Sequence, residues 1–269
     1  MNDRWGEPPC PEEVSFCQGT LSSVVVTAMT ATPETILPSR FPVPFTPVAK
    51  PPAKTNGRKN HTLHKDSLVI LKNGGDFHVI SENYSYKSDA YYTILQMETE
   101  DKKTKPSTSA VIDAFVVPIC LERAKLAGIP VCNWEISQAY VQLPAILYGL
   151  NYFATTAEFV AVYNNEKAKE AIKHITNKSK YPFCYQKLGE GAEISQCTVI
   201  FGKTIGQDDA VSQIAEKIYE LFSIPLLMMV LVRTGENYAL SSLSPVRYSH
   251  LSESERSLLE ARITHQEFL

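Results

Sequence analysis

Proline is distributed very unevenly along this chain of 269 residues, and that distribution limits where a fold can form. Ten of the 17 prolines lie in residues 1–62. Each proline fixes φ and lacks a backbone N–H, so helices and sheet ladders are hard to sustain there. The stretch FPVPFTPVAKPPAK (41–54) is typical of an extended, polyproline-like segment. We therefore expect a disordered, Pro-rich tail over residues 1–62 and an ordered domain over residues 63–269.

The overall composition is that of an ordinary globular protein, with 44% hydrophobic and 20% charged residues. The net charge of -3 gives no reason to expect nucleic acid or an anionic membrane as a partner. No apolar run reaches the roughly 18 residues that a membrane helix needs. The first residues are acidic, unlike a secretion signal, and the six cysteines show no CxxC pair. These features predict a cytoplasmic protein with reduced thiols.

Beyond the tail, apolar runs of strand length alternate with stretches of helical periodicity. Strands are predicted at 67–72, 77–81, 158–163, 181–187, 195–201, 225–232 and 237–243, with 111–117 as a further strand or buried segment. Helices are predicted at 89–100, 120–132, 166–178, 208–222 and from Ser252 onward, where Glu255 completes a capping box. The segment 133–156 is predicted to be partly irregular. This pattern predicts an α+β fold, a mixed α/β sheet with flanking helices.

The run NYSYKSDAYY (83–92) holds four tyrosines within nine residues. Tyrosine buries a large ring but keeps a polar tip that needs a partner, and a helix that Ser88 caps would offer free N–H groups. The two residues Tyr84 and Tyr86 have the spacing of one strand face. The rings can simply pack on the core, or they can form a recognition surface. The candidate binding residues are Tyr84, Tyr86, Ser88, Tyr91 and Tyr92.

A second candidate is the segment KLGEGAE (187–193), which follows a predicted strand. A lysine before a glycine-rich turn can hold a phosphate, because glycines let backbone amides approach it. The candidate residues are Lys187, Gly189 and Gly191. The segment lacks the G-K-[ST] ending of a Walker A loop, and an ordinary turn would look the same.

Catalytic and metal-binding signatures are missing from the sequence. There is no HExxH, GxSxG or paired-carboxylate motif, and the six histidines are dispersed. We therefore predict neither a catalytic residue nor a metal site.

Several short motifs resemble those of the RimK-like ATP-grasp N-terminal domain (RLAN) family. They are Asn83, Tyr84, Ser85, Tyr86, Ser88, Tyr91, Tyr92 and Leu95, then Pro106 and Ser107, then VIFGKT (199–204), ELFSIPLLMMVLV (220–232) and NYALSSLSPVRYSHL (237–251). Their order is consistent across roughly residues 67–263. The sequence departs from the pattern at Ala90, where the family favours glycine, and it ends at Leu269, where family members usually continue into an ATP-grasp ligase domain.

The resemblance implies a non-catalytic accessory or substrate-recognition domain without a cofactor. Its expected partner is an ATP-grasp ligase or a peptide or amino-acid substrate. In an alternative interpretation, residues 128–187 resemble the start of an ATP-grasp fold. The chain would then be a partial or degenerate carboxylate–amine ligase, which binds ATP and Mg²⁺ through Lys187. A third interpretation is a scaffold protein that interacts through PxxP spacing in its tail.

Overall fold

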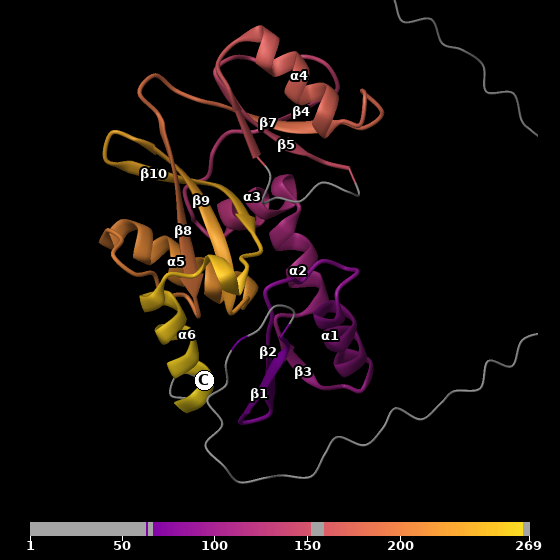
Figure 1. Ribbon diagram of the computed structural model, residues 1–269, viewed down its shortest axis with the longest axis vertical. Helices are drawn as coiled ribbons and strands as arrows, with labels where there is room; N and C mark the ends of the chain where they lie inside the picture. The colour runs from indigo at the N-terminus through magenta and orange to yellow at the C-terminus, as the bar shows by residue number, and fades with distance from the viewer. Residues whose placement is uncertain (1–62, 64–66, 152–158, 266–269) are drawn as a thin grey trace, which may run out of the picture. The chain divides into compact units, whose positions relative to one another are not determined.

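The computed structural model describes residues 63, 67–151 and 159–265. All of them belong to the second of two compact units, Gly57–Leu269, which is described here by itself. The predicted disordered tail, residues 1–62, lies outside the described residues. The described part contains six α-helices and ten strands (Figure 1). The α+β prediction is therefore confirmed.

The helices and strands follow one another in mixed order along the chain. The helices are α1 (Asp89–Thr99), α2 (Thr108–Phe115), α3 (Val117–Leu126), α4 (Asn165–Ile175), α5 (Asp209–Phe222) and α6 (Glu253–His265), with a short 3-10 helix at Tyr248–His250. The strands are β1 (Val69–Asn73), β2 (Asp76–Ile80), β3 (Lys103–Lys105), β4 (Glu135–Ser137), β5 (Ala145–Gly149), β6 (Phe159–Val162), β7 (Phe183–Lys187), β8 (Glu193–Ile200), β9 (Leu226–Thr234) and β10 (Asn237–Ser244).

The first sheet has the order β1-β2-β3. β1 and β2 form an antiparallel hairpin in which Asn73 lies opposite Asp76. The turn contains Gly74 and Gly75 at φ +59° and +140°, values that glycine adopts without steric cost. β3 joins β2 in parallel, because helix α1 provides the crossover between them.

The second sheet is antiparallel and has the order β10-β9-β8. The β9–β10 hairpin turns at RTGE (233–236), between the predicted strands 225–232 and 237–243, with Gly235 at φ +63°. Contacts to β10 come from α2 and α3, and contacts to β8 come from α6. The sequence places one apolar stripe on the predicted helix 208–222, and α5 packs this stripe on the main core. Its members are Val211, Ile214, Ala215, Ile218, Phe222 and the partly buried Leu221.

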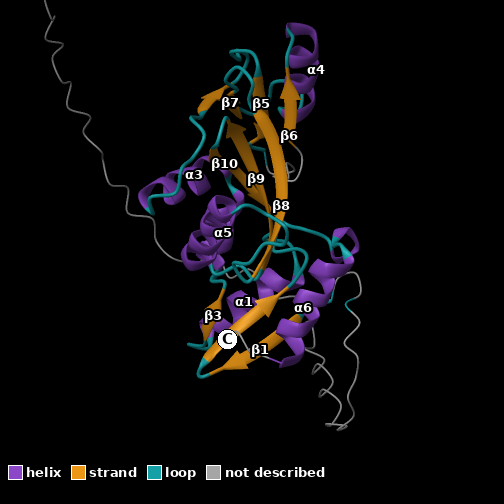
Figure 2. Ribbon diagram, turned by 90° about the vertical axis from the view of Figure 1, so that its left-hand side faces the viewer, coloured by secondary structure: helices purple, strands orange, loops and turns teal. Residues whose placement is uncertain are grey.

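The third sheet is also antiparallel, with the order β4-β7-β5-β6 (Figure 2 shows β5, β6 and β7 near α4). β5 pairs with both β6 and β7, so it is buried on both edges. One face packs against α4 through a core cluster that includes Leu147, Phe183 and Tyr185. The other face contributes Ile146, Tyr148 and Cys184 to the main core.

A buried polar contact joins the second and third sheets. The Tyr148 hydroxyl lies 2.6 Å from Ser241 Oγ on β10. On β7, Gln186 donates to the Ser241 carbonyl at 2.7 Å and accepts from Ser241 Oγ at 2.6 Å. All three side chains are buried, so these bonds satisfy polar groups that would otherwise destabilise the core.

Two local predictions are wrong. Residues 111–117 form the end of α2 and the start of α3 rather than a strand, and Ser107 caps α2 by accepting from the Ala110 N–H. Asn165 directly precedes the predicted helix 166–178 and is expected from the sequence to cap it, but the cap of α4 is Asn164. The segment 133–156, predicted to be partly irregular, contains β4 and the fully paired β5 between loop residues in its described part. No helix within the described ranges is long and apolar enough to cross a membrane.

Candidate functional site

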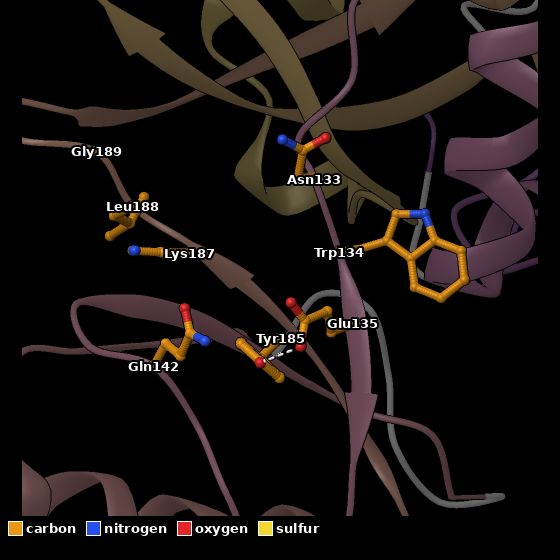
Figure 3. A pocket seen from close by; sticks show the side chains of 8 residues that line it. All are labelled: Asn133, Trp134, Glu135, Gln142, Tyr185, Lys187, Leu188 and Gly189. Carbon is orange, nitrogen blue, oxygen red and sulfur yellow. Dashed lines mark hydrogen bonds between the residues drawn. The ribbon is translucent and has the colours of Figure 1, made fainter. Parts of the chain in front are cut away.

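A pocket of about 340 Å³ opens beside β4 and the end of β7 (Figure 3). Its lining consists of Asn133, Trp134, Glu135, Gln142, Tyr185, Lys187, Leu188 and Gly189. Figure 3 shows Lys187 and Gln142 at one end and the Trp134 ring at the other. The pocket therefore includes Lys187 and Gly189, two of the residues that the sequence singles out.

Strand pairing brings these residues together although they are about 50 positions apart. β4 and β7 are antiparallel, and Glu135 lies directly opposite Tyr185. Directly paired residues of an antiparallel ladder point to the same face, and residues two apart on one strand share that face. Lys187 therefore lies on the same sheet face as Tyr185 and Glu135.

Lys187 provides the positive charge of the pocket. It is the last residue of β7, and its side chain is exposed. In the part of the chain that the structure describes, no ion pair or side-chain hydrogen bond engages its ammonium group. An ammonium group in this position can bind a carboxylate or a phosphate as a point charge.

Glu135 provides the negative charge, and Tyr185 holds it in place. The Tyr185 hydroxyl donates a hydrogen bond to Glu135 Oε2. This hydrogen bond to the carboxylate, together with burial, raises the pKa of Tyr185 to about 12. The phenol thus stays protonated at neutral pH and keeps donating, which fixes the orientation of the carboxylate.

The remaining lining combines two amides with apolar surface. The side chains of Asn133 and Gln142 are exposed and can both donate and accept hydrogen bonds. Trp134 and Leu188 also pack against the main core, so they present a fixed apolar wall. Gly191 is not part of the lining, but it adopts φ +68° in the turn that follows. The site can hold a small ligand that carries a negative group and further hydrogen-bonding groups.

The tyrosine cluster does not form one surface. Tyr84 is fully buried, and its hydroxyl donates to the Val79 carbonyl and accepts from the Ser81 N–H, each at 3.0 Å. Tyr84 and Tyr86 do not lie in a strand, so the predicted shared strand face is wrong. For Tyr84, the structure matches the core-packing interpretation.

The other residues of the cluster have mixed surroundings. Ser88 caps α1 by accepting from the Tyr91 N–H at 3.2 Å, as predicted. Tyr91 packs against the main core, whereas Tyr92 is 57% exposed. Tyr86 is exposed, with the Lys87 ammonium 5.6 Å from its ring centroid. The role of these residues in binding stays a prediction.

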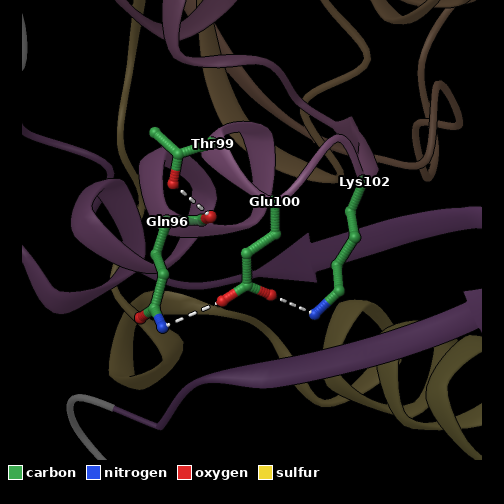
Figure 4. A network of polar contacts seen from close by, with 4 residues as sticks. All are labelled: Gln96, Thr99, Glu100 and Lys102. Carbon is green, nitrogen blue, oxygen red and sulfur yellow. Dashed lines mark hydrogen bonds and ion pairs between the residues drawn. The ribbon is translucent and has the colours of Figure 1, made fainter.

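The lysine-rich segment after the tyrosines ends α1 (Figure 4). Glu100 accepts from Gln96 Nε2 at 3.2 Å and pairs with Lys102 at 2.5 Å, while Thr99 donates to the Gln96 carbonyl. The hydrogen bond from Lys102 lowers the pKa of Glu100. These contacts lie at the C-terminal end of α1, and they pair the charges of Glu100 and Lys102 with each other.

Among the described residues, no group of three or more His, Cys, Asp or Glu side chains is arranged to hold a metal ion. The described cysteines are free, and burial raises the pKa of the Cys120 thiol well above its usual value.

Comparison with known protein families finds a match in the second half of the chain. Residues 157–262 match the family described as the RimK-like ATPgrasp N-terminal domain. The resemblance predicted from the sequence is thus confirmed over this stretch. The matched residues include Lys187, Gly189 and Gly191, whereas the tyrosine cluster lies before them.

Solved ATP-grasp ligases are similar to this chain at low sequence identity. The ATP-grasp ligase PsnB, complexed with a phosphomimetic variant of minimal precursor, Mg and ADP, is 13% identical, with a TM-score of 0.44 over 74% of this chain and 85% of that chain. A RimK domain protein ATP-grasp from Sphaerobacter thermophilus is 15% identical, with a TM-score of 0.49 over 66% and 75%. D-alanine-D-alanine ligase from Coxiella burnetii is 11% identical, with a TM-score of 0.45 over 65% of each chain. No curated protein matches the chain.

Sequence reasoning missed most of the pocket. Asn133, Trp134, Glu135 and Gln142 lie in the segment predicted to be partly irregular, and no local motif marks them. The signal that could have found them is the alternation of polar and apolar residues in NWEIS (133–137), which is typical of a strand. This strand, β4, pairs with β7, the strand that ends at Lys187.

Proposed function

We propose that this domain is an accessory recognition module, related to RimK-type ATP-grasp ligases, that binds an amino acid or peptide through the Lys187 pocket. The observation that carries the proposal is the exposed Lys187 ammonium group in a pocket that also presents a carboxylate and two amides. A peptide end carries complementary groups, because its carboxylate can pair with lysine and its amide can bond to Asn or Gln. The family match over residues 157–262 supports a relationship with amino-acid ligation.

The pocket replaces the tyrosine cluster as the proposed recognition surface. The cluster has Tyr84 in the core and Ser88 engaged as a helix cap. The Lys187 pocket is concave, as small-molecule sites usually are, and three of its lining residues, Glu135, Tyr185 and Lys187, lie in paired strands.

A second candidate function is nucleotide binding at the same place. Lys187 and Gly189 both line the pocket, and Gly191 adopts a positive φ in the turn that follows. A lysine at a strand end before such a turn can hold a phosphate. In this case the chain would be a partial or degenerate carboxylate–amine ligase, and Mg²⁺ would accompany the bound ATP.

Calorimetry on the full chain distinguishes the two candidates. L-alanyl-L-alanine and Mg²⁺–ATP are titrated separately into the unmodified protein, the Lys187→Gln variant and a Lys169→Gln control on the exposed face of α4. We expect the dipeptide to bind and the Lys187→Gln variant to lose about tenfold or more in affinity, the size of one charge-assisted hydrogen bond. The Lys169→Gln control should bind as the unmodified protein does.

The nucleotide-binding candidate would be favoured if Mg²⁺–ATP binds, the dipeptide does not, and the Lys187→Gln variant no longer binds Mg²⁺–ATP. If neither ligand binds, or if both lysine variants behave alike, the Lys187 pocket is not the recognition site. The scaffold interpretation concerns the proline-rich residues 1–62, which lie outside the described part, and it stays a prediction, as does the cytoplasmic location.

A further inference from the structure

β4 is the terminal strand of the third sheet. The sheet order ends at β4, and among the described residues β4 pairs only with β7. The outer edge of such a strand presents N–H and C=O groups that can pair with another extended chain. Ile136, in the middle of β4, is 54% exposed, so its apolar side chain is available to a partner.

The Lys187 pocket lies at the beginning of this edge strand. Asn133, Trp134 and Glu135 line the pocket and lead into β4, which runs from Glu135 to Ser137. A chain that added antiparallel to β4 would therefore have its carboxyl end beside Asn133, at the pocket. Neighbouring strands lie about 4.8 Å apart. Lys187 is on the next strand inward and has a long side chain, so it can reach a carboxylate placed there.

We propose that the free edge of β4 binds an extended peptide as an added antiparallel strand, with the peptide's terminal carboxylate held by Lys187. This inference rests on the proposed function and narrows its ligand from an amino acid or peptide to a peptide of several residues. Main-chain hydrogen bonds would supply affinity along β4, and alternate side chains would supply specificity.

The side chains of β4 indicate which peptide fits. If the last peptide residue lies opposite Asn133, then the third residue from its end lies opposite Glu135 and the fourth lies opposite Ile136. Paired side chains point to the same face, so a basic residue suits the third position and an apolar residue suits the fourth. The peptide acetyl-Thr-Ile-Lys-Thr-Val with a free carboxylate meets these requirements.

The test is calorimetry on the full chain with this peptide and with four comparison ligands. They are the C-terminal amide of the same peptide, two versions N-methylated on alternate sets of residues, and acetyl-valine. We expect the free-acid peptide to bind about tenfold or more tightly than both the amide and acetyl-valine. One N-methylated set should abolish binding and the other should be tolerated, because only alternate residues of an added strand bond to the edge.

Two variants test where on the protein the peptide binds. Lys187→Gln should reduce the affinity for the free acid to that for the amide and leave the amide unchanged. Ile136→Glu should weaken the binding of the peptide and leave the affinity for acetyl-valine unchanged. Circular dichroism checks that the variant folds. Equal binding of peptide and acetyl-valine, or tolerance of both N-methylated sets, would overturn strand addition while the pocket stands. Failure of every ligand to bind would overturn the strand addition together with the proposed function.

Discussion

The four tyrosines between residues 84 and 92 have different surroundings, and these surroundings determine how each should respond to substitution. Tyr84 is buried among Val79, Phe115 and the main core, and its ring stacks on Phe115 at a centroid distance of 6.4 Å. Burial raises the pKa of Tyr84 well above its usual value, so the hydroxyl is always protonated. Tyr92 projects to solvent from α1. A short motif of identical residues thus combines a core position and a surface position.

Replacing Tyr84 with phenylalanine should lower the free energy of unfolding by about 1–3 kcal/mol, because the Ser81 N–H and the Val79 carbonyl lose their buried partner. Denaturant titration of the full chain measures this change. Tyr92→Phe is the matched control and should leave stability unchanged within about 0.5 kcal/mol. Equal stability of the two variants would show that Tyr84 does not hold the position described.

Glycine is required at residue 202 for two reasons. Gly202 has φ +76°, and an added Cβ would lie 2.9 Å from the Cβ of Tyr219 on α5. Gly206 has a similar φ of +67° but nothing within 4 Å of its added Cβ. Gly206→Ala should therefore cost about 1–2 kcal/mol of backbone strain, and Gly202→Ala should cost clearly more. Equal costs in denaturant titrations of the two variants would contradict the close packing of this turn on α5.

At the scale of elements, the first sheet should respond to pH through His78. His78 is buried in β2, and burial lowers its pKa below the usual 6.5, with a further lowering by Lys105 opposed by Asp76. His78 therefore takes up a proton less readily in the folded protein than in the unfolded chain. Above about pH 6.5 both forms are neutral at this residue, and stability falls as the pH drops below that value.

The expected result is a decline in the free energy of unfolding between pH 6.5 and pH 5, measured by denaturant titration. His78→Asn should flatten this decline, since the titrating group is gone. This pH range lies above the usual value of 3.8 for Asp76, whose pKa the Lys105 and Lys103 hydrogen bonds lower further. A decline that persists in His78→Asn would assign it to another group.

Elements with distinct ends or clear periodicity could be predicted from the sequence, whereas short and mostly apolar elements could not. The stripe of α5 and the capping box of α6 are local signals, and the structure shows both. In the capping box the Ser252 N–H donates to Glu255 Oε2 at 2.8 Å, and the Glu255 N–H donates to Ser252 Oγ at 3.3 Å. The run 111–117 is apolar except for Asp113, and over so short a run period alone does not separate a helix from a strand. Ser107, which caps α2, was the available signal. β5 lies directly after Pro144 and is identified only by its partners β6 and β7.

At the scale of the whole described unit, the third sheet connects the pocket to the core. Gln186 lies between the pocket residues Tyr185 and Lys187 on β7 and is bonded to Ser241 on β10. The strand that carries Lys187 is therefore fixed to the second sheet by buried hydrogen bonds. The sequence predicted Lys187 and Gly189, but the opposite wall depended on the β4–β7 pairing, a contact between distant segments.

The central claim is that Lys187 recognises a carboxylate in the pocket that Trp134 lines. The chain has two tryptophans, so a Trp5→Phe variant leaves Trp134 as the single fluorescent reporter. Titration of this variant with L-alanyl-L-alanine should give a saturable change in Trp134 fluorescence, and adding Lys187→Gln should weaken the apparent affinity about tenfold or more. An unchanged affinity after Lys187→Gln, or no response of Trp134 to the dipeptide, would contradict the claim.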